Sequence, residues 1–486
     1  MQEQYLEKAI EIIKTLNDFT YQAYLIGGVV RDYIMHNEFN DIDICTSATP
    51  EQVQALFPEV RMEYAHLGFV TLKVDDMSFE ISTFKEEVYE GHRKPSKIYY
   101  AQTLVEDVKR RDFTINALAL TDKYQVVDLV KGQKDIKHKT IRIIGKGRKR
   151  FKEDPLRILR AYNLVGRFNF RIATGTEYAI MATNKYLKEI SNYQISRELH
   201  KIITSKYGKR AVKTLVDLKT NEHLKDYEKG LYIISRHFKK FDLIEKFALC
   251  YAVNNQIPEH TCFDKATLTK IQSILKCVEA TKDINPKNDI NLTVKDVFNY
   301  GVDLLLSASK INYYLRNKYP KLAKTIKNLD EKLPIHSISE MKFHGSDITD
   351  LNNGETGPYI KDIMEQLSTE VILGMVENNH KALKTRAVEL LEEYKDKEHG
   401  IVTDPHEVVT EEEKVVENTN NELINLKVRF DIEYTELLKS NLASFVKGDE
   451  TPDQLEELEK TISHGIKEGL INQNPEYKIL EEKGLI

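Results

Sequence analysis

Two aspartates separated by one residue, Asp41 and Asp43, are the first residues whose type and spacing suggest chemistry. On a strand their side chains point to the same face, so the two carboxylates can hold one divalent cation or a pair of them. A Gly27-Gly28 turn precedes them, and Arg31 lies on the short helix expected after that turn. Backbone N–H groups of a glycine turn can approach a phosphate closely, and a helix start favours negative charge. A solvated strand and an ordinary turn explain either feature alone, so the prediction depends on their combination.

A second group of residues could bind a phosphate or a base. Arg110 and Arg111 beside Asp112 form a fork that can hold phosphate or ribose oxygens, with the carboxylate fixing its direction. Further along, Asp154 is a good helix N-cap with Pro155 at the first helical position. Arg157 and Arg160 then lie one turn apart on that helix.

Local patterns predict the elements that position these residues. Apolar residues at helical spacing, capping signals and alternating runs indicate helices over 2–17 and 50–56, strands over 24–26 and from about 41, and a hairpin of 68–74 with 78–84 turning at 75–77. The polar segment 86–100 contains Gly91 and Pro95, and we expect a flexible loop there that interrupts the strands. Helical patterns are expected from residue 146 to about 395.

These motifs carry a family resemblance. Residues 27–32 followed by 41–43 resemble the head signature of class II tRNA nucleotidyltransferases, the CCA-adding enzymes, and of the related bacterial poly(A) polymerases. Residues 110–118 match the second motif of that family, and 153–160 resemble its protein template, which selects the incoming base. The resemblance implies a polymerase-β-like α/β head with a mixed sheet, followed by an all-α neck, body and tail.

The resemblance also implies roles for particular residues. Asp41 and Asp43 would be catalytic and would bind Mg²⁺, with Glu80 on the second hairpin strand as a candidate third carboxylate. Asp154 would accept from the exocyclic amine of C or A while Arg157 donates beside it. The full set of expected nucleotide-binding residues is Gly28, Arg31, Arg111, Asp112, Asp154, Arg157 and Arg160. The family commonly has a further arginine where this chain has Asn163.

Other segments resemble further parts of the same family. Residues 93–95 resemble part of its flexible loop. Residues 195–199 resemble its last neck motif, in which we expect Arg197 and Glu198 to brace the template helix, although a surface ion pair is an equal alternative. Segments 343–348, 357–360 and 372–374 resemble the junction of body and tail. Tyr313 and Tyr314 are expected to pack rather than stack on bases.

The predicted domains are a nucleotidyltransferase head (1–145), a neck with the template (146–220), a body (221–335), a tRNA-binding tail (336–397), an acidic linker (398–421) and a helical extension of unknown role (422–486). Residues 401–486 hold 20 acidic and 9 basic residues, so the other 56 acidic and 62 basic residues leave the first 400 positions slightly basic. That balance is compatible with RNA binding. The extension could serve a homodimer contact or a partner protein, or shield the basic body.

The remaining composition narrows the class of protein. There is no apolar leader and no run of 18 apolar residues, so we expect a cytoplasmic protein without membrane contact. The four cysteines lack zinc-ligand spacing and are expected to be reduced thiols, mostly buried.

The predicted activity is template-independent addition of C, C and A to the tRNA 3′ end from CTP and ATP by two-metal nucleotidyl transfer. A poly(A) polymerase, or an enzyme that adds only CC or only A, is the nearest alternative. A non-catalytic RNA-binding protein on the same scaffold is a more distant one.

Overall fold

The structure is a computed structural model of the 486-residue chain. It describes residues 2–39, 41–74, 77–91, 95–285, 290–316 and 319–399, so the predicted linker and extension after residue 399 lie outside the described residues. The chain divides into two compact units, residues 1–389 and 390–486, and all the described strands belong to the first. The predicted boundaries at 145, 220 and 335 fall inside that unit and stay predictions.

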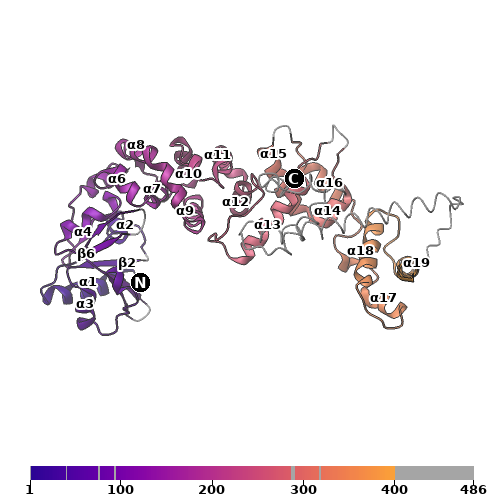
Figure 1. Ribbon diagram of the computed structural model, residues 1–486, viewed down its shortest axis with the longest axis horizontal. Helices are drawn as coiled ribbons and strands as arrows, with labels where there is room; N and C mark the ends of the chain where they lie inside the picture. The colour runs from indigo at the N-terminus through magenta and orange to yellow at the C-terminus, as the bar shows by residue number, and fades with distance from the viewer. Residues whose placement is uncertain are drawn as a thin grey trace, which may run out of the picture. The chain divides into compact units, whose positions relative to one another are not determined.

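The N-terminal part contains the strands (Figure 1). Its elements are α1 (Gln2–Asp18), β1 (Ala23–Ile26), α2 (Gly28–Ile34), β2 (Ile42–Thr46), α3 (Pro50–Leu56), β3 (Phe69–Val74), β4 (Met77–Thr83), β5 (Lys85–Val88), β6 (Lys97–Tyr100), α4 (Leu104–Arg110), β7 (Ala119–Leu120), β8 (Val126–Val127), α5 (Gly132–Lys137) and β9 (Thr140–Ile141).

Six of these strands form one mixed sheet in the order β3-β4-β2-β1-β7-β8. Only β2 and β4 run parallel within it, and the other neighbours are antiparallel. Apolar residues of α1 pack on one face with Leu25, Ile44 and Phe79. The opposite face carries a second cluster that includes Ile26, Cys45 and Phe84. The expected α/β head with a mixed sheet is therefore confirmed.

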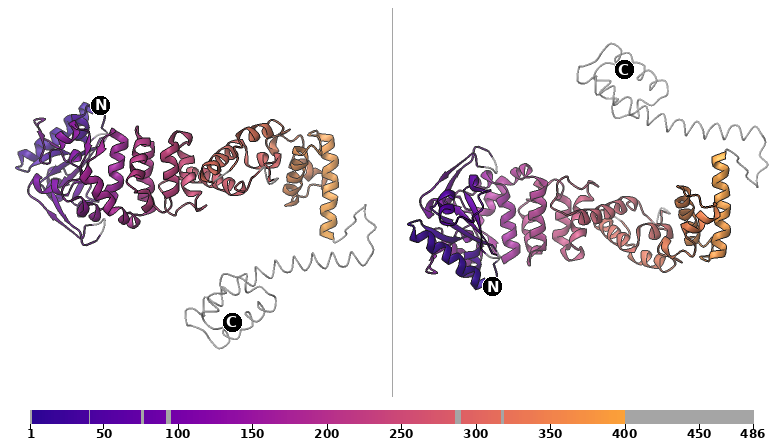
Figure 2. Two further views of the ribbon diagram at one scale, coloured as in Figure 1. Left: turned by 90° about the horizontal axis from the view of Figure 1, so that it is seen from above. Right: turned by 90° about the horizontal axis from the view of Figure 1, so that it is seen from below.

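Helices make up most of the described chain after β9, and Figure 2 shows the change from sheet to helices along the colour gradient. They are α6 (Gly147–Glu153), α7 (Leu156–Phe168), α8 (Thr174–Thr183), α9 (Asn192–Thr204), α10 (Gly208–Asp217), α11 (Glu228–His237), α12 (Leu243–Tyr251), α13 (Lys265–Ala280), α14 (Val294–Tyr300), α15 (Val302–Leu315), α16 (Ala323–Asp330), α17 (Gly345–Leu351), α18 (Tyr359–Ile372) and α19 (His380–His399). The single strand among these described helices, β10 (Arg171–Ile172), pairs with β9.

Local signals predict several elements correctly. Thr49 forms the capping box that starts α3 at Pro50, and α1 covers the predicted N-terminal helix. The predicted hairpin is β3 with β4, in which Val74 pairs with Met77. Tyr314 packs against Phe241, as expected of a packing residue. All four cysteines are free thiols, and only Cys262 is less than fully buried.

The expectation of a loop over 86–100 is wrong at the two ends of that segment, 86–88 and 97–100, which are strands. β5 and β6 pair antiparallel from Lys85↔Tyr100 to Val88↔Lys97, and the breakers Gly91 and Pro95 lie only between the strands. Cross-strand pairing satisfies the backbone here even though the side chains are polar. Arg93 and Lys94, two of the three residues that resemble the family's flexible loop, lie outside the described residues.

Candidate active site

A cavity of about 660 Å³ brings the predicted motifs together. We call it the arginine-rich pocket, and its walls come from the sheet part of the chain and from α7 and α9. Nine of the ten predicted site residues line it: Gly28, Arg31, Asp41, Asp43, Arg111, Asp112, Asp154, Arg157 and Arg160. Residues separated by more than a hundred positions thus face one space.

Asp43 lies on an interior strand, which weighs against a merely solvated strand face. β2 is flanked by β4 and β1, and the buried Ile42 and Ile44 point into the core on the face opposite Asp43. Asp41 is exposed and directly precedes the strand rather than lying within it. Burial, followed by the nearby charge of Asp41, raises the pKa of Asp43, although Arg111 acts in the opposite direction.

Glu80 is the predicted residue that the pocket does not include. It lies on β4, directly opposite Asp43 in the parallel register. Neighbours in register project to the same face of a sheet, so the two carboxylates are adjacent. Partial burial and then the charge of Asp43 raise the pKa of Glu80. Glu80 therefore stands beside the pocket, near the aspartate pair.

The aspartate pair fits a magnesium site that substrate would complete. Neither Asp41 nor Asp43 has a hydrogen bond or an ion pair with a described residue, so their oxygens are available as ligands. No group of three metal-ligating side chains occurs in the described part of the chain. Mg²⁺ commonly uses one or two carboxylates together with waters and substrate phosphates.

The glycine turn approaches the aspartates closely. Gly27 has φ 89° and ψ −135°, a conformation open to glycine and strained for other residues. A Cβ atom at Gly27 would lie 3.4 Å from Asp43 Oδ2. Gly28 begins α2, where a Cβ atom would lie 3.4 Å from the Arg31 guanidinium. The turn thus brings its backbone beside the carboxylate of Asp43.

Arg31 is buried and already paired. Its Nε and Nη2 donate to Asp32 at 3.1 and 2.8 Å, and its Nη1 donates to Asn116 Oδ1. Arg167 of α7 also donates to Asp32, at 2.8 Å. Burial lowers the pKa of Arg31 more than the ion pair with Asp32 raises it. This cluster joins α2 to α7 at one end of the pocket.

The expected partnership of Arg110 and Arg111 with Asp112 is wrong. Asp107, which is fully buried, accepts from Arg110 Nε at 2.8 Å and from Arg111 Nε at 2.9 Å. Arg110 and Arg111 follow Asp107 by three and four residues, the spacing of ion pairs on one helix. Asp112, the next residue after Arg111, does not bind either arginine. Burial raises the pKa of Asp107, but the two arginines outweigh it, so the net shift is downward.

Asp112 pairs with Arg160 of α7 instead. Arg160 Nη2 lies 2.7 Å from Asp112 Oδ2, an ion pair without hydrogen-bond geometry. The Asp112 Oδ1 atom accepts from the Phe113 N–H at 2.7 Å. Burial raises the pKa of Asp112, but Arg160 and the Phe113 N–H lower it by more, so the net shift of this pKa is downward. Arg160, beside Asp112, has a raised pKa.

Asp154 and Arg157 differ in how many hydrogen bonds they make within the protein. Asp154 Oδ1 accepts from the Leu156 N–H at 3.1 Å, the bond expected of a cap, although Pro155 is the residue that borders α7. Arg157 is buried and donates to the carbonyls of Arg150 at 3.1 Å and of Arg110 at 3.4 Å. Its guanidinium is therefore held in a fixed orientation at the pocket wall.

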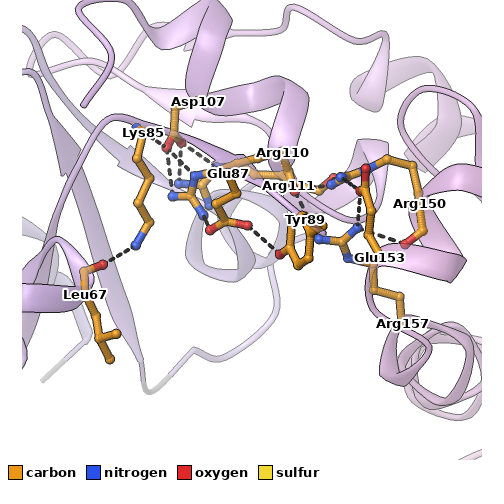
Figure 3. A network of polar contacts seen from close by, with 10 residues as sticks. All are labelled: Leu67, Lys85, Glu87, Tyr89, Asp107, Arg110, Arg111, Arg150, Glu153 and Arg157. Carbon is orange, nitrogen blue, oxygen red and sulfur yellow. Dashed lines mark hydrogen bonds and ion pairs between the residues drawn. The ribbon is translucent and has the colours of Figure 1, made fainter. Parts of the chain in front are cut away.

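Figure 3 shows one polar network, which includes Asp107, the two arginines that bind it, and Arg157. Glu87 on β5 accepts from Tyr89 Oη at 2.7 Å and from Arg110 Nη1 at 3.3 Å. The Arg110 carbonyl accepts from Arg150 as well as from Arg157. The network runs from the hairpin through α4 to α6 and α7, and Glu87 and Tyr89 line the pocket.

Glu198, in the segment that resembles the neck motif, binds both Asn163 and Lys201. Glu198 of α9 accepts from Asn163 Nδ2 at 3.2 Å and from Lys201 Nζ at 2.8 Å. Glu198 thus braces α7, as one of the two alternatives proposed. Arg197 is exposed and makes no hydrogen bond or ion pair with a described residue, so it braces nothing there.

Sequence reasoning missed several residues that line the pocket or hold its arginines in place. Asp107 could have been found from its helical spacing to two arginines. Asn116 and Arg167 could not, because their partners lie 85 and 135 residues away, and Lys201 lies just outside the neck motif whose glutamate it binds. Long-range pairing leaves no local pattern.

The comparisons with known proteins agree with this geometry. Residues 23–142 match the poly A polymerase head domain, and 244–387 match a putative tRNA nucleotidyltransferase domain 2. A CCA-adding enzyme of Bacillus cereus (strain G9842) is 30% identical over 391 residues, covering 78% of this chain and 97% of that protein. The chain belongs to the CCA-adding enzyme family. One of Staphylococcus saprophyticus is also 30% identical, over 401 residues.

Solved structures of the family share the fold. The CCA-adding enzyme of Bacillus stearothermophilus in complex with CTP has a TM-score of 0.58 and 28% identity, covering 82% of this chain and 99% of the other. The Thermotoga maritima CCA-adding enzyme complexed with tRNA has a TM-score of 0.57 at 19% identity, covering 80% and 96%, and shows likeness of fold.

Membership in this family makes the chain a nucleotidyltransferase, as predicted. Among the helices within the described ranges, none is long and apolar enough to cross a membrane.

Proposed function

We propose that this protein adds C, C and A to the 3′ end of tRNA from CTP and ATP, without a nucleic-acid template and with release of pyrophosphate, in the cytoplasm. The observation that carries the proposal is that one cavity joins Asp41 and Asp43 to Asp154 and Arg157. The names of the relatives, which match over nearly their whole length, support the same reaction.

Asp41 and Asp43 would hold Mg²⁺, because their carboxylate oxygens have no hydrogen-bond or ion-pair partner among the described residues. When bound, such ions lower the pKa of an attacking hydroxyl and neutralise charge on the phosphates. The chain's own task at this end is to position the triphosphate. The Gly27-Gly28 backbone lies beside Asp43, and Arg111 is held in orientation by Asp107.

Asp154 and Arg157 would read the base. Asp154 keeps acceptor capacity beyond its bond to Leu156, so it can accept from the exocyclic amine of C or A. Arg157 is oriented by backbone carbonyls and can donate to ring acceptors next to that amine. U and G do not present the same edge, so binding them would leave buried polar groups unpaired.

The experiment offers tRNA substrates that end before the first C, after C and after CC, with CTP, ATP or both, and measures product length. Completion to CCA and no further supports the proposal. Long A tails would identify a poly(A) polymerase. Addition of only CC or only A would identify an enzyme that performs part of the reaction. Absence of any extension would favour a non-catalytic RNA-binding protein.

Asp41→Ala tests the metal end of the pocket. We expect loss of nucleotide addition by at least about a thousandfold, because charge stabilisation supplies most of the catalysis in phosphoryl transfer. The folded state and tRNA affinity should be nearly unchanged, because Asp41 is exposed and unpaired among the described residues. Asp350→Ala, at an exposed position on α17, is the matched control. A fully active Asp41→Ala enzyme would contradict the assignment.

A further inference from the structure

The charges around the arginine-rich pocket can be accounted for one by one. Fourteen charged side chains line it, and ten of them form ion pairs within 4 Å. Four have no ion-pair partner among the described residues: Asp41, Asp43, Asp154 and Arg197. Unpaired charges in a pocket are the groups left available for a ligand.

The three free carboxylates already have proposed tasks, two with metal and one with a base. Arg197 is the single free cation on the described pocket wall. Every other pocket cation is engaged, including the neighbouring Lys201 of α9, which pairs with Glu198 at 2.8 Å. An arginine fork without a carboxylate partner is suited to bidentate binding of a phosphate.

The position of Arg197 on α9 is fixed by what surrounds it. Its neighbours Ser196 and Glu198 are buried, and Ser196 Oγ accepts from the Cys262 N–H at 2.9 Å. Glu198 binds Asn163 of α7, so α9 is held against the template helix. The exposed guanidinium is thus presented to the pocket from a well-anchored helix.

We propose that Arg197 binds a phosphate of the substrates, and so is a ligand-binding residue rather than a brace of the template helix. This inference rests on the proposed function for its ligands. The phosphate belongs either to the triphosphate of the incoming nucleotide or to the backbone of the tRNA 3′ end. Both present the same oxyanion to the guanidinium, and the test separates them.

The test compares the wild-type enzyme with Arg197→Gln, Arg197→Lys and a control, Arg236→Gln. Arg236 is an exposed arginine on α11 outside the pocket. Kd for CTP is measured without RNA, Kd for tRNA lacking its CCA end is measured without nucleotide at several salt concentrations, and product length is measured with both.

If Arg197 binds the triphosphate, Arg197→Gln raises Kd for CTP about tenfold or more and leaves Kd for tRNA unchanged. If it binds the RNA backbone, tRNA binding weakens and the slope of log K against log salt becomes shallower by about 1. In either case Arg197→Lys recovers part of the loss, which a bracing role through Glu198 would not produce.

Unchanged affinities for both ligands in Arg197→Gln would overturn the inference, even if the wild-type enzyme completes CCA. A wild-type protein that fails to add nucleotides, yet loses CTP or tRNA affinity on Arg197→Gln, would overturn the proposed function and keep the inference. Thermal unfolding of each variant accompanies the assays, and a Tm equal to that of Arg236→Gln is expected for an exposed side chain.

Discussion

At the scale of single residues, the site depends on which charges are satisfied within the protein and which are left for ligands. Asp107 shows the first kind: it is fully buried and binds two arginines. Asp43 shows the second, because its carboxylate is partly buried and has no bond to a described residue. The two aspartates should therefore respond to mutation in opposite ways, Asp107 in stability and Asp43 in catalysis.

Asp107→Asn should lower the free energy of unfolding by about 3 kcal/mol, because removal of one partner leaves two partly buried arginine charges uncompensated. Urea denaturation measures this, with Asp350→Asn as an exposed control. The folded-state pKa of Asp107 is depressed, so its contribution is present above the unfolded value near 4 and is lost as pH falls through the folded value. The difference between wild type and variant should narrow below about pH 4. A constant difference down to pH 2 would contradict a stabilising role for the Asp107 charge.

Gly27→Ala should impair the metal end of the pocket through the backbone. The φ of 89° with ψ −135° is strained for alanine by about 1–3 kcal/mol, and the new Cβ atom would lie 3.4 Å from Asp43 Oδ2. We expect a lower kcat/KM for CTP together with reduced stability in urea. Gly91→Ala is the control, since no atom of a described residue lies within 4 Å of its Cβ position and its φ is outside the strained left-handed range. Equal behaviour of the two variants would count against the close approach.

At the scale of elements, the polar network ties α4 to the helices after the sheet. Arg150 of α6 donates to the carbonyls of Arg110 and Arg111 at the end of α4, where carbonyl groups lack helical partners. Its Nη1 donates to Glu153 of the same helix. Because Arg157 binds the Arg110 carbonyl too, the backbone at the end of α4 contacts both Arg150 and Arg157.

Arg150→Met should lower the free energy of unfolding by about 1.5–3 kcal/mol, the range for hydrogen bonds to charged groups. It should also raise KM for both nucleotides, because Arg111 and Arg157 lose a shared support. Arg150→Lys keeps the charge but not the planar fork. We therefore expect it to restore less than half of the unfolding free energy that Arg150→Met loses. Urea titration and steady-state kinetics are the measurements. A normal KM in a clearly destabilised Arg150→Met enzyme would separate this contact from nucleotide binding.

Elements set by local signals are predictable from the sequence, and those set by pairing are not. The capping box of Thr49 and the alternation of β3 and β4 predict correct bounds within a residue or two. The residues of β5 and β6 are polar and indicate a loop, yet they form a hairpin because its stability comes from partners across the strand. In the site, the motif residues are predictable, whereas Asn116 and Arg167 were missed because long-range contacts select them. Asp107 was missed although its contacts with Arg110 and Arg111 follow helical spacing.

At the scale of the whole molecule, charge is unevenly distributed along the chain. Residues 401–486 carry 20 acidic and 9 basic residues, while the first 400 positions have 62 basic and 56 acidic ones. The family models match no further than residue 387. Every residue of the arginine-rich pocket lies between positions 27 and 201, so none belongs to the acidic part. We expect the acidic part to act on RNA binding through long-range charge.

Deletion of residues 400–486 tests that influence. Removal of a net charge of −11 should strengthen tRNA binding at about 50 mM salt roughly tenfold, because an acidic segment in the same molecule repels the RNA backbone. Kd for CTP should change little, since every residue of the arginine-rich pocket is retained and its ligand contacts are short-ranged. Salt provides the control: at about 0.5 M the Debye length falls to a few ångströms, and the two proteins should then bind tRNA equally. If the deletion weakens tRNA binding at every salt concentration, the acidic part contributes contacts to RNA and the repulsion argument fails.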